Sequence, residues 1–449
     1  MFLFLTFIFK LAHLQIFKLD MKYLPINSKL FIDNRQKFIA ELPPNSMAII
    51  LANDEMPRSA DQAFVFRQNP DLFWLSGIDQ EKTALIIYPD CPNPTYREAL
   101  FLRKTNEVIA VWEGHKYTMP EAREASGIQQ IFWEESFEGA LTALMSYCDK
   151  VFINLNENDR SDNVVPYKDI RFANELKYKY PAHEIKRLGP IMAKLRSVKN
   201  PIEIDIIKQA CGITRDAFLR VLKFMKPGVM EYEVEAEIIH EFIRQRANGH
   251  AYTPIIASGA NACVLHYIEN NRVCNDGNLV LMDFGAEYAN YAADLTRTIP
   301  ANGKFTPRQK DVYNAVLRVM KQAKTLLKPG NILSDYNNEV GKIMEAELIG
   351  LGLLDKEAVA KQDEKNPLYK KYFMHGTSHF LGIDVHDIGN RYAPMQVGNV
   401  FTCEPGIYIP EENIGIRIEN DVVITENGVI DLMADIPIEV EEIEDLMNR

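Results

Sequence analysis

Cysteine is scarce in this chain. Only six of the 449 residues are cysteines, and no two of them form a Cys-x-x-Cys pair. Scattered cysteines without a framework spacing argue against disulfides and against a zinc cage of thiolates, and they are typical of reduced thiols. The cysteine content therefore predicts a cytoplasmic protein.

Basic charge is also in short supply. Lysine and arginine number 50 against 62 acidic residues, which gives a formal net charge of −12. Nucleic acids and anionic membranes both bind basic surfaces. We therefore expect neither of them as a partner.

Long apolar runs are absent as well. The chain opens with nine apolar or small residues, but Lys10 ends this run, which is too short to span a bilayer. The run also lacks the positive start and the small-residue cleavage site of a signal peptide. We expect residues 1–20 to be an extension outside the fold, with a folded domain beginning at Met21. A short membrane-associating helix is the alternative.

The length is sufficient for two or three domains with their own cores. Short β-rich runs bounded by turn residues alternate with helical stretches in the first third and predict an α/β domain over residues 21–183. The charged, proline-containing segment 180–199 is expected to be a linker. The expected strands are 47–53, 84–90, 98–104 and 150–156.

The second domain, expected over residues 184–449, contains a faint internal repeat. Asn200 and Pro201 supply an N-cap and a first-turn proline for a long amphipathic helix that Lys-Pro-Gly ends at residue 228. Residues 306–330 repeat this plan, and each copy is followed by a second helix and then by β-rich sequence. The pattern predicts an α/β (α+β) chain whose second domain has pseudo-two-fold symmetry and one curved antiparallel sheet covered by helices.

Two strand-like runs in the first half of the repeat, 279–284 and 291–299, flank a turn near residues 287–290. Folding the hairpin about this turn would place Asp283 opposite Asp294, with Cβ atoms ~5 Å apart. Facing aspartates among apolar neighbours repel each other unless a cation lies between them.

The second half of the repeat has a similar hairpin around residues 410–413. Glu404 and Glu419 are nearly equidistant from its centre, and Arg417 shares a strand face with Glu419. Four carboxylates and a histidine suit a pair of divalent ions such as Mn²⁺, Fe²⁺, Co²⁺ or Zn²⁺. Two such ions ~3.5–4 Å apart can hold a hydroxide that hydrolyses an amide.

The stretch HGTSHFLGIDVHDIG, residues 375–389, contains His375, His379 and His386. Gly376 and Gly382 interrupt any long regular element there, and only the first two histidines share strand parity. The three histidines are therefore expected to differ in role. One would complete the metal shell, and the others would bind the substrate or the charge that develops on its carbonyl.

These residues resemble the pita-bread metallopeptidases. The matching stretches are MDFGAEYANYAADLTRT, HGTSHFLGIDVHDIG, CEPGIYIPEENIGIRIEND and SGANACVLHY. The segment FRQNPDLFWLSG (66–77) makes the chain most similar to the branch that contains aminopeptidase P and prolidase. In that segment Arg67, Gln68 and Trp74 have either a site role or a packing role.

The resemblance implies a role for each site residue. Glu404 would also carry the proton of the water, and Arg417 would support the bridging glutamate and take part in substrate binding. Asp294 and Glu419 would bridge two ions, for which Mn²⁺ is expected and Co²⁺, Zn²⁺ or Fe²⁺ are the alternatives. The implied metal ligands are Asp283, Asp294, His379, Glu404 and Glu419; the implied carbonyl-stabilising, catalytic histidines are His266 and His386, and His375 would line the proline-side pocket.

The resemblance further implies an aminopeptidase that releases the N-terminal residue from peptides with proline in second position, by attack of the bridging hydroxide on the Xaa-Pro amide. Peptides are the expected partners, and a homo-oligomer (dimer or tetramer) is expected. The alternative is prolidase, which accepts Xaa-Pro dipeptides and needs a cation for their carboxylate; Arg391 is the only candidate in the short segment after His386. The intact ligand set argues against an inactive binding protein and against a creatinase-like activity.

Overall fold

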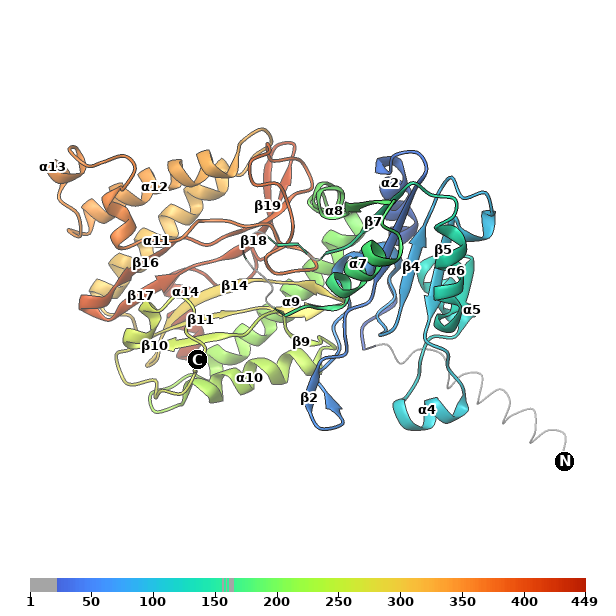
Figure 1. The fold of residues 1–449 in the computed structure, drawn as a ribbon. Coiled ribbons are helices and arrows are strands. Elements are labelled where there is room, and N and C mark those ends of the chain that lie inside the picture. Colours follow the sequence, from blue (N-terminus) through green and yellow to red (C-terminus); the bar gives the residue numbers. More distant parts are fainter. Residues whose placement is uncertain (1–21, 156, 159, 161–164) are drawn as a thin grey trace, which may run out of the picture. The chain divides into compact units, whose positions relative to one another are not determined.

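The computed structural model describes residues 22–155, 157, 158, 160 and 165–449 (Figure 1). The extension expected over residues 1–20 lies outside the described residues. The chain divides into two compact units, with the boundary between Leu188 and Gly189.

The first unit contains a mixed six-stranded sheet in the order β6-β5-β4-β1-β7-β8. The four strands that the sequence predicts are confirmed as β1, β4, β5 and β7. The strands of this unit are β1 (Ser46–Leu51), β2 (Pro57–Ser59), β3 (Gln62–Ala63), β4 (Ala84–Ile87), β5 (Glu98–Leu102), β6 (Gln130–Trp133), β7 (Lys150–Ile153) and β8 (Glu184–Arg187). Its helices are α2 (Lys29–Glu41), α3 (Pro70–Ser76), α4 (Glu107–Glu113), α5 (Met119–Ser126), α6 (Phe137–Leu144) and α7 (Lys168–Lys179).

The linker expected over residues 180–199 is not irregular. Residues 184–187 form strand β8, which pairs in parallel with β7, and α8 (Gly189–Arg196) follows directly. The sequence EIKR hides this strand because β8 is a largely exposed edge strand, whose side chains need not be apolar. The boundary between the two compact units, at Leu188 and Gly189, nevertheless falls inside this segment.

The long helix of the second unit begins and ends where the sequence predicts. In α9 (Pro201–Phe224) the Asn200 side chain accepts a hydrogen bond from Ile202 N at 2.9 Å, and Glu203 accepts one from Asn200 N at 2.8 Å. This reciprocal capping box satisfies amide donors that the first helical turn leaves unpaired.

The rest of the second unit follows the predicted repeat. Each half supplies a pair of packed helices, α9 with α10 and α11 with α12, and a three-stranded antiparallel sheet, β10-β11-β14 and β15-β18-β19 (Figure 1). The further helices are α10 (Glu231–Arg244), α11 (Pro307–Leu326), α12 (Leu333–Gly350), α13 (Lys356–Val359) and α14 (Val440–Met447). The strands are β9 (Gly249–His250), β10 (Ile255–Ser258), β11 (Leu279–Phe284), β12 (Ala286–Tyr288), β13 (Tyr291–Ala292), β14 (Leu295–Pro300), β15 (Val400–Cys403), β16 (Gly406–Ile409), β17 (Ile414–Arg417), β18 (Asn420–Thr425) and β19 (Gly428–Asp431).

The first hairpin has a different register from the expected one. Asp283 pairs with Thr296 and not with Asp294. The reason is the turn, which is centred on Ala289 and Asn290; both have positive φ (51° and 67°), as a two-residue hairpin turn requires. This centre lies one residue beyond the expected one. The correction shifts the partner by two positions, so Asp283 and Asp294 still point to the same face of the hairpin.

The second hairpin keeps one register throughout. Cys403 lies opposite Asn420 in β15–β18, and Gly406 lies opposite Arg417 in β16–β17. Both pairs have the same centre, and that centre places Glu404 opposite Glu419, as the sequence predicts. The two halves meet here, because the backbone N–H of Glu419 donates to the Thr296 carbonyl at 3.1 Å.

Among the described residues, no helix combines the length and the apolar character that crossing a membrane would require.

Candidate metal centre

The two hairpins bring the predicted carboxylates together in the second unit. Ligand atoms of Asp294, His379 and Glu419 all lie within 4.8 Å of one another, and all three side chains are buried. Asp283 joins this group through Tyr252, whose hydroxyl is 2.6 Å from Asp283 Oδ1 and 2.5 Å from Asp294 Oδ1.

His379 connects the two pairs of carboxylates. Its Nε2 atom lies 3.5 Å from Asp294 Oδ2 and 3.6 Å from Glu404 Oε1. Its Nδ1 atom is 3.0 Å from the Phe380 carbonyl, to which a protonated Nδ1 would donate. That hydrogen bond selects the tautomer whose Nε2 lone pair points toward the carboxylates, which is the arrangement of a metal ligand.

The electrostatics of this group fit a cation. Burial, followed by the charge of Asp283, raises the pKa of Asp294 well above its ordinary value. Burial also raises the pKa of Glu419, with Asp294 and Glu404 adding to the rise, and it raises the pKa of Glu404 to about 7. Carboxyl groups with raised pKa values bind protons when no cation is present. A divalent ion would neutralise their negative charge instead, and carboxylate oxygens are suitable ligands for such an ion. The residues present therefore fit the metal that the sequence predicts.

Arg417 has a different set of partners from the expected one. We expected it to support Glu419 and to bind substrate. Its Nη2 instead donates to Asp283 Oδ2 at 2.5 Å, its Nη1 to the Tyr408 hydroxyl at 2.8 Å and its Nε to Thr296 Oγ1 at 3.1 Å. The charge of Arg417 also acts directly on Glu419, and the Thr296 hydroxyl, which donates to Glu419 Oε2 at 2.6 Å, links the two side chains by hydrogen bonds. The reason is the corrected register, which aligns Thr296 with Asp283.

The other predicted histidines lie around the carboxylates. The ring of His386 is exposed and meets the ring of His379 edge to face, with centroids 4.5 Å apart. His375 Nε2 is 2.8 Å from the Tyr408 hydroxyl, and its Nδ1 is 3.8 Å from Glu404 Oε2. His266 is exposed and follows a short 3₁₀ turn (Gly259–Cys263). Burial is the main cause that lowers the pKa of His375 to about 4, and His266 is close enough to add to this effect.

Sequence reasoning missed three residues of this site. Tyr252 and Tyr408 join it through long-range contacts, and no local pattern distinguishes them from other tyrosines. Thr296 could have been found, since it lies two positions after Asp294 in an extended segment and so shares its face.

The residues Gln68 and Trp74 of the first unit have packing roles there. Gln68 Nε2 donates to the carbonyls of Ile78 and Gln80 at 3.0 and 2.8 Å, and the Trp74 side chain is only 1% exposed. Gln68 ties the chain before α3 to the chain after it, and Trp74 packs in the core of the first unit.

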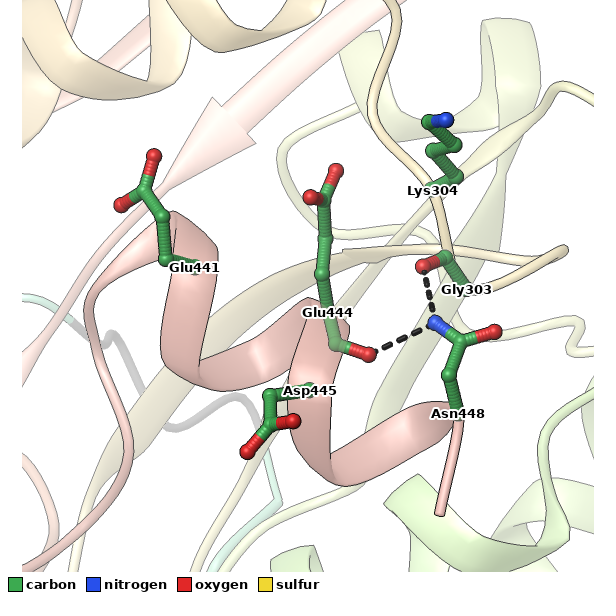
Figure 2. A pocket seen from close by; sticks show the side chains of 6 residues that line it. All are labelled: Gly303, Lys304, Glu441, Glu444, Asp445 and Asn448. Atoms are coloured by element: carbon green, nitrogen blue, oxygen red, sulfur yellow. Dashed lines mark hydrogen bonds between the residues drawn. The ribbon is translucent and has the colours of Figure 1, made fainter.

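A surface hollow of about 430 Å³ lies beside α14 (Figure 2). The Asn448 side chain closes one wall by donating to the Gly303 and Glu444 carbonyls at 2.9 and 2.6 Å. None of the predicted site residues lines this hollow, which is formed by Gly303, Lys304, Glu441, Glu444, Asp445 and Asn448.

Comparison with known proteins places the carboxylate centre in a family. Residues 205–426 match metallopeptidase family M24, and residues 31–152 match the aminopeptidase P N-terminal domain. The Xaa-Pro aminopeptidase of Escherichia coli is 35% identical over 439 residues, which cover 94% of this chain and 98% of the relative. The chain belongs to metallopeptidase family M24. The predicted family, the fold and the class of metal-dependent hydrolase are thereby confirmed.

Two further M24 comparisons bear on substrate length. E. coli aminopeptidase P with the inhibitor Pro-Leu superimposes with a TM-score of 0.84 at 33% identity, covering 95% of this chain and 99% of that one. The Xaa-Pro dipeptidase of Rattus norvegicus is 30% identical over 486 residues, which cover 96% of each chain. Both activities therefore occur among full-length relatives of this M24 protein.

Proposed function

We propose that this M24 protein is an Xaa-Pro aminopeptidase, which releases the N-terminal residue from peptides with proline in second position. The observation that carries the proposal is the convergence of Asp283, Asp294, His379, Glu404 and Glu419 on one buried group, in a chain that aligns over nearly its full length with Xaa-Pro aminopeptidases.

The same five residues would hold two divalent ions, for which we propose Mn²⁺. Ligand atoms of Asp294 and Glu419 lie within 4.8 Å of each other, and we assign these two carboxylates as the ligands that both ions would share. Bound ions would polarise the substrate carbonyl and lower the pKa of a water molecule to near neutrality.

The protein groups around the ions would move the protons and stabilise charge. Glu404, with its pKa of about 7 in the metal-free protein, is assigned the transfer of the proton from water to the leaving nitrogen. His386 and His266 have exposed rings near the centre, and we assign them to the oxyanion that forms on the carbonyl. His375 is assigned to the proline side.

The proline specificity has a chemical reason. The amide nitrogen of proline carries no hydrogen, so a peptidase cannot hold the substrate through that N–H. A site for Xaa-Pro bonds must instead fit the ring and bind residues on either side of the bond.

Prolidase remains the second candidate because the rat Xaa-Pro dipeptidase aligns with 96% of this chain. The two are separated by comparing an Xaa-Pro-Xaa tripeptide with the matching Xaa-Pro dipeptide in the presence of Mn²⁺. We expect kcat/KM for the tripeptide to be at least about tenfold higher, equivalent to ~1.4 kcal/mol of transition-state binding. Cleavage of the dipeptide with no cleavage of longer peptides would establish a prolidase.

We also propose that the protein acts in the cytoplasm as a homo-oligomer, a dimer or tetramer. The scattered thiols support the first proposal, and light scattering of the purified protein tests the second.

A further inference from the structure

A largely buried cluster of four charged side chains lies next to the metal centre, and the proposed chemistry does not use it. Lys199 Nζ donates to Asp387 Oδ2 at 2.7 Å. Arg196 Nη2 donates to Asp387 Oδ1 and, at 2.9 Å, to Asp384 Oδ2. We call these four residues the Asp387 cluster.

Three of the four side chains are almost completely shielded from solvent, whereas that of Asp384 is 27% exposed. The side chains of Lys199 and Asp387 are each 1% exposed, and that of Arg196 is 3% exposed. A Cβ atom at Gly382 would lie 2.1 Å from Asp387 Oδ2, so the backbone at Gly382 packs directly against the carboxylate. Two cations face two carboxylates, and burying such a group adds little to stability because desolvation offsets the attraction. A geometric role explains the cluster better than a stabilising one.

The cluster encloses the loop that presents His386. The backbone N–H of Asp387 donates to the Phe380 carbonyl at 2.9 Å, and this hydrogen bond closes the loop. Phe380 follows His379 in the sequence, and Asp387 follows His386. Asp384 and Asp387 flank His386 on both sides, and both are held by Arg196. His386 is an exposed residue, and its ring meets the His379 ring with centroids 4.5 Å apart, so the anchored loop holds this ring beside a predicted metal ligand.

We infer that Lys199 and Arg196 are positioning residues for the reaction: through Asp387 they hold the His386 ring at the place where charge develops on the substrate carbonyl. This inference rests on the role that we propose for His386. A displacement of about 1 Å at a catalytic group can lower turnover by ~10²-fold. A rigid anchor can therefore matter for turnover even when it adds little to the stability of the fold.

The test is a double-mutant cycle with Lys199→Met and His386→Ala in the full-length, Mn²⁺-loaded protein. We expect Lys199→Met alone to lower kcat by about 10- to 100-fold, with KM changed less than about threefold and the metal content unchanged. In the His386→Ala background the same change should lower kcat by less than about twofold, because the residue being positioned is already absent. Equal losses in both backgrounds would overturn the inference, as would a His386→Ala protein as active as the wild type.

Two additions make the cycle decisive. Lys310→Met is the matched control, because Lys310 forms a 2.9 Å ion pair with Glu444 in the same unit and neither residue is among the predicted site residues; its kcat should equal that of the wild type. If Lys199→Met does not fold, Asp384→Asn replaces it, since Asp384 is 27% exposed and its loss leaves the buried Lys199–Asp387 pair intact.

A readout without turnover separates this inference from the proposed function. Imidazole NMR signals of the metal-free protein should shift or broaden for His386 in the anchor variant and stay unchanged for exposed His240. An unchanged His386 signal overturns the inference. Absence of hydrolysis by the wild type would overturn the proposed function. The NMR result would still decide whether Lys199 and Arg196 position the His386 ring.

Discussion

The half-buried histidine of strand β9, His250, whose ring nitrogens are shielded from solvent, should make the second unit sensitive to acid. Its ring packs edge to face on Phe242 with centroids 5.1 Å apart, and neither ring nitrogen has a hydrogen-bond partner within the described part of the chain. Burial lowers the pKa of His250 from 6.5 to about 4. A proton on this ring has no group to receive its charge.

The sign and the magnitude of the effect follow from linkage. The unfolded chain binds a proton at His250 below pH 6.5, whereas the folded chain binds it only near pH 4. The contribution of His250 to stability is therefore complete above pH 6.5 and is lost progressively as the pH falls toward 4. A difference of 2.5 pKa units corresponds to about 3 kcal/mol at most.

Replacing His250 by leucine should remove this loss. At pH 7.5 the variant should be at least as stable as the wild type, because an apolar side chain replaces unpaired polar atoms. Between pH 7 and 4.5 its free energy of unfolding should fall by ~2–3 kcal/mol less than that of the wild type. His240→Leu is the control, since His240 is exposed on α10.

The assay must report on the second unit. Trp74, Trp112 and Trp133 all precede Gly189, so tryptophan fluorescence would follow the first unit alone. Hydrogen exchange of the β9 and β12 amides in the presence of a chelator avoids this problem. If the wild type and His250→Leu lose protection in parallel on acidification, the reasoning is refuted.

Three further predictions concern the metal centre. Asp294→Asn should lose bound Mn²⁺ and essentially all turnover, because Asp294 is assigned a bridging position; elemental analysis that finds full metal content would contradict this assignment. His379→Ala should weaken metal binding, whereas His386→Ala should keep the metal and lower kcat by about 10²–10³-fold; a metal-free but folded His386→Ala protein would reverse the two roles. Tyr252→Phe should lower metal affinity by about 10- to 100-fold in chelator competition, since its hydroxyl orients Asp283 and Asp294; unchanged affinity would make that contact dispensable.

The sequence predicts those parts of the fold that depend on local patterns. The capping residues around Asn200 and the apolar period of the helix set the limits of α9, and β-branched runs identify strands such as β1 and β4. Strand β8 has no such pattern, because its side chains are largely exposed and its pairing with β7 depends on distant residues. Its presence could not be inferred from residues 184–187 alone.

The candidate site shows the same division. Charges in apolar strands identify Asp283 and Glu404, since such charges are costly without a partner. The register of the first hairpin was misplaced because the turn expected near residues 287–290 is centred one residue before the observed turn at Ala289 and Asn290. Gly285 lies where the two strands approach closely: a Cβ there would lie 1.7 Å from the Ala293 carbonyl oxygen.

The partners of Arg417 show that a metal site also depends on residues that are not metal ligands. A carboxylate group with raised pKa values opposes folding until a cation neutralises it, and Arg417 supplies part of that charge from within the protein through Asp283. The arginine is in turn fixed by Thr296 and Tyr408, and Thr296 continues the chain of hydrogen bonds to Glu419. The two halves of the repeat are thus joined through the same groups that orient the ligands. The contact between the halves and the arrangement of the carboxylates therefore depend on the same hydrogen bonds, which bring together residues that lie far apart in the sequence.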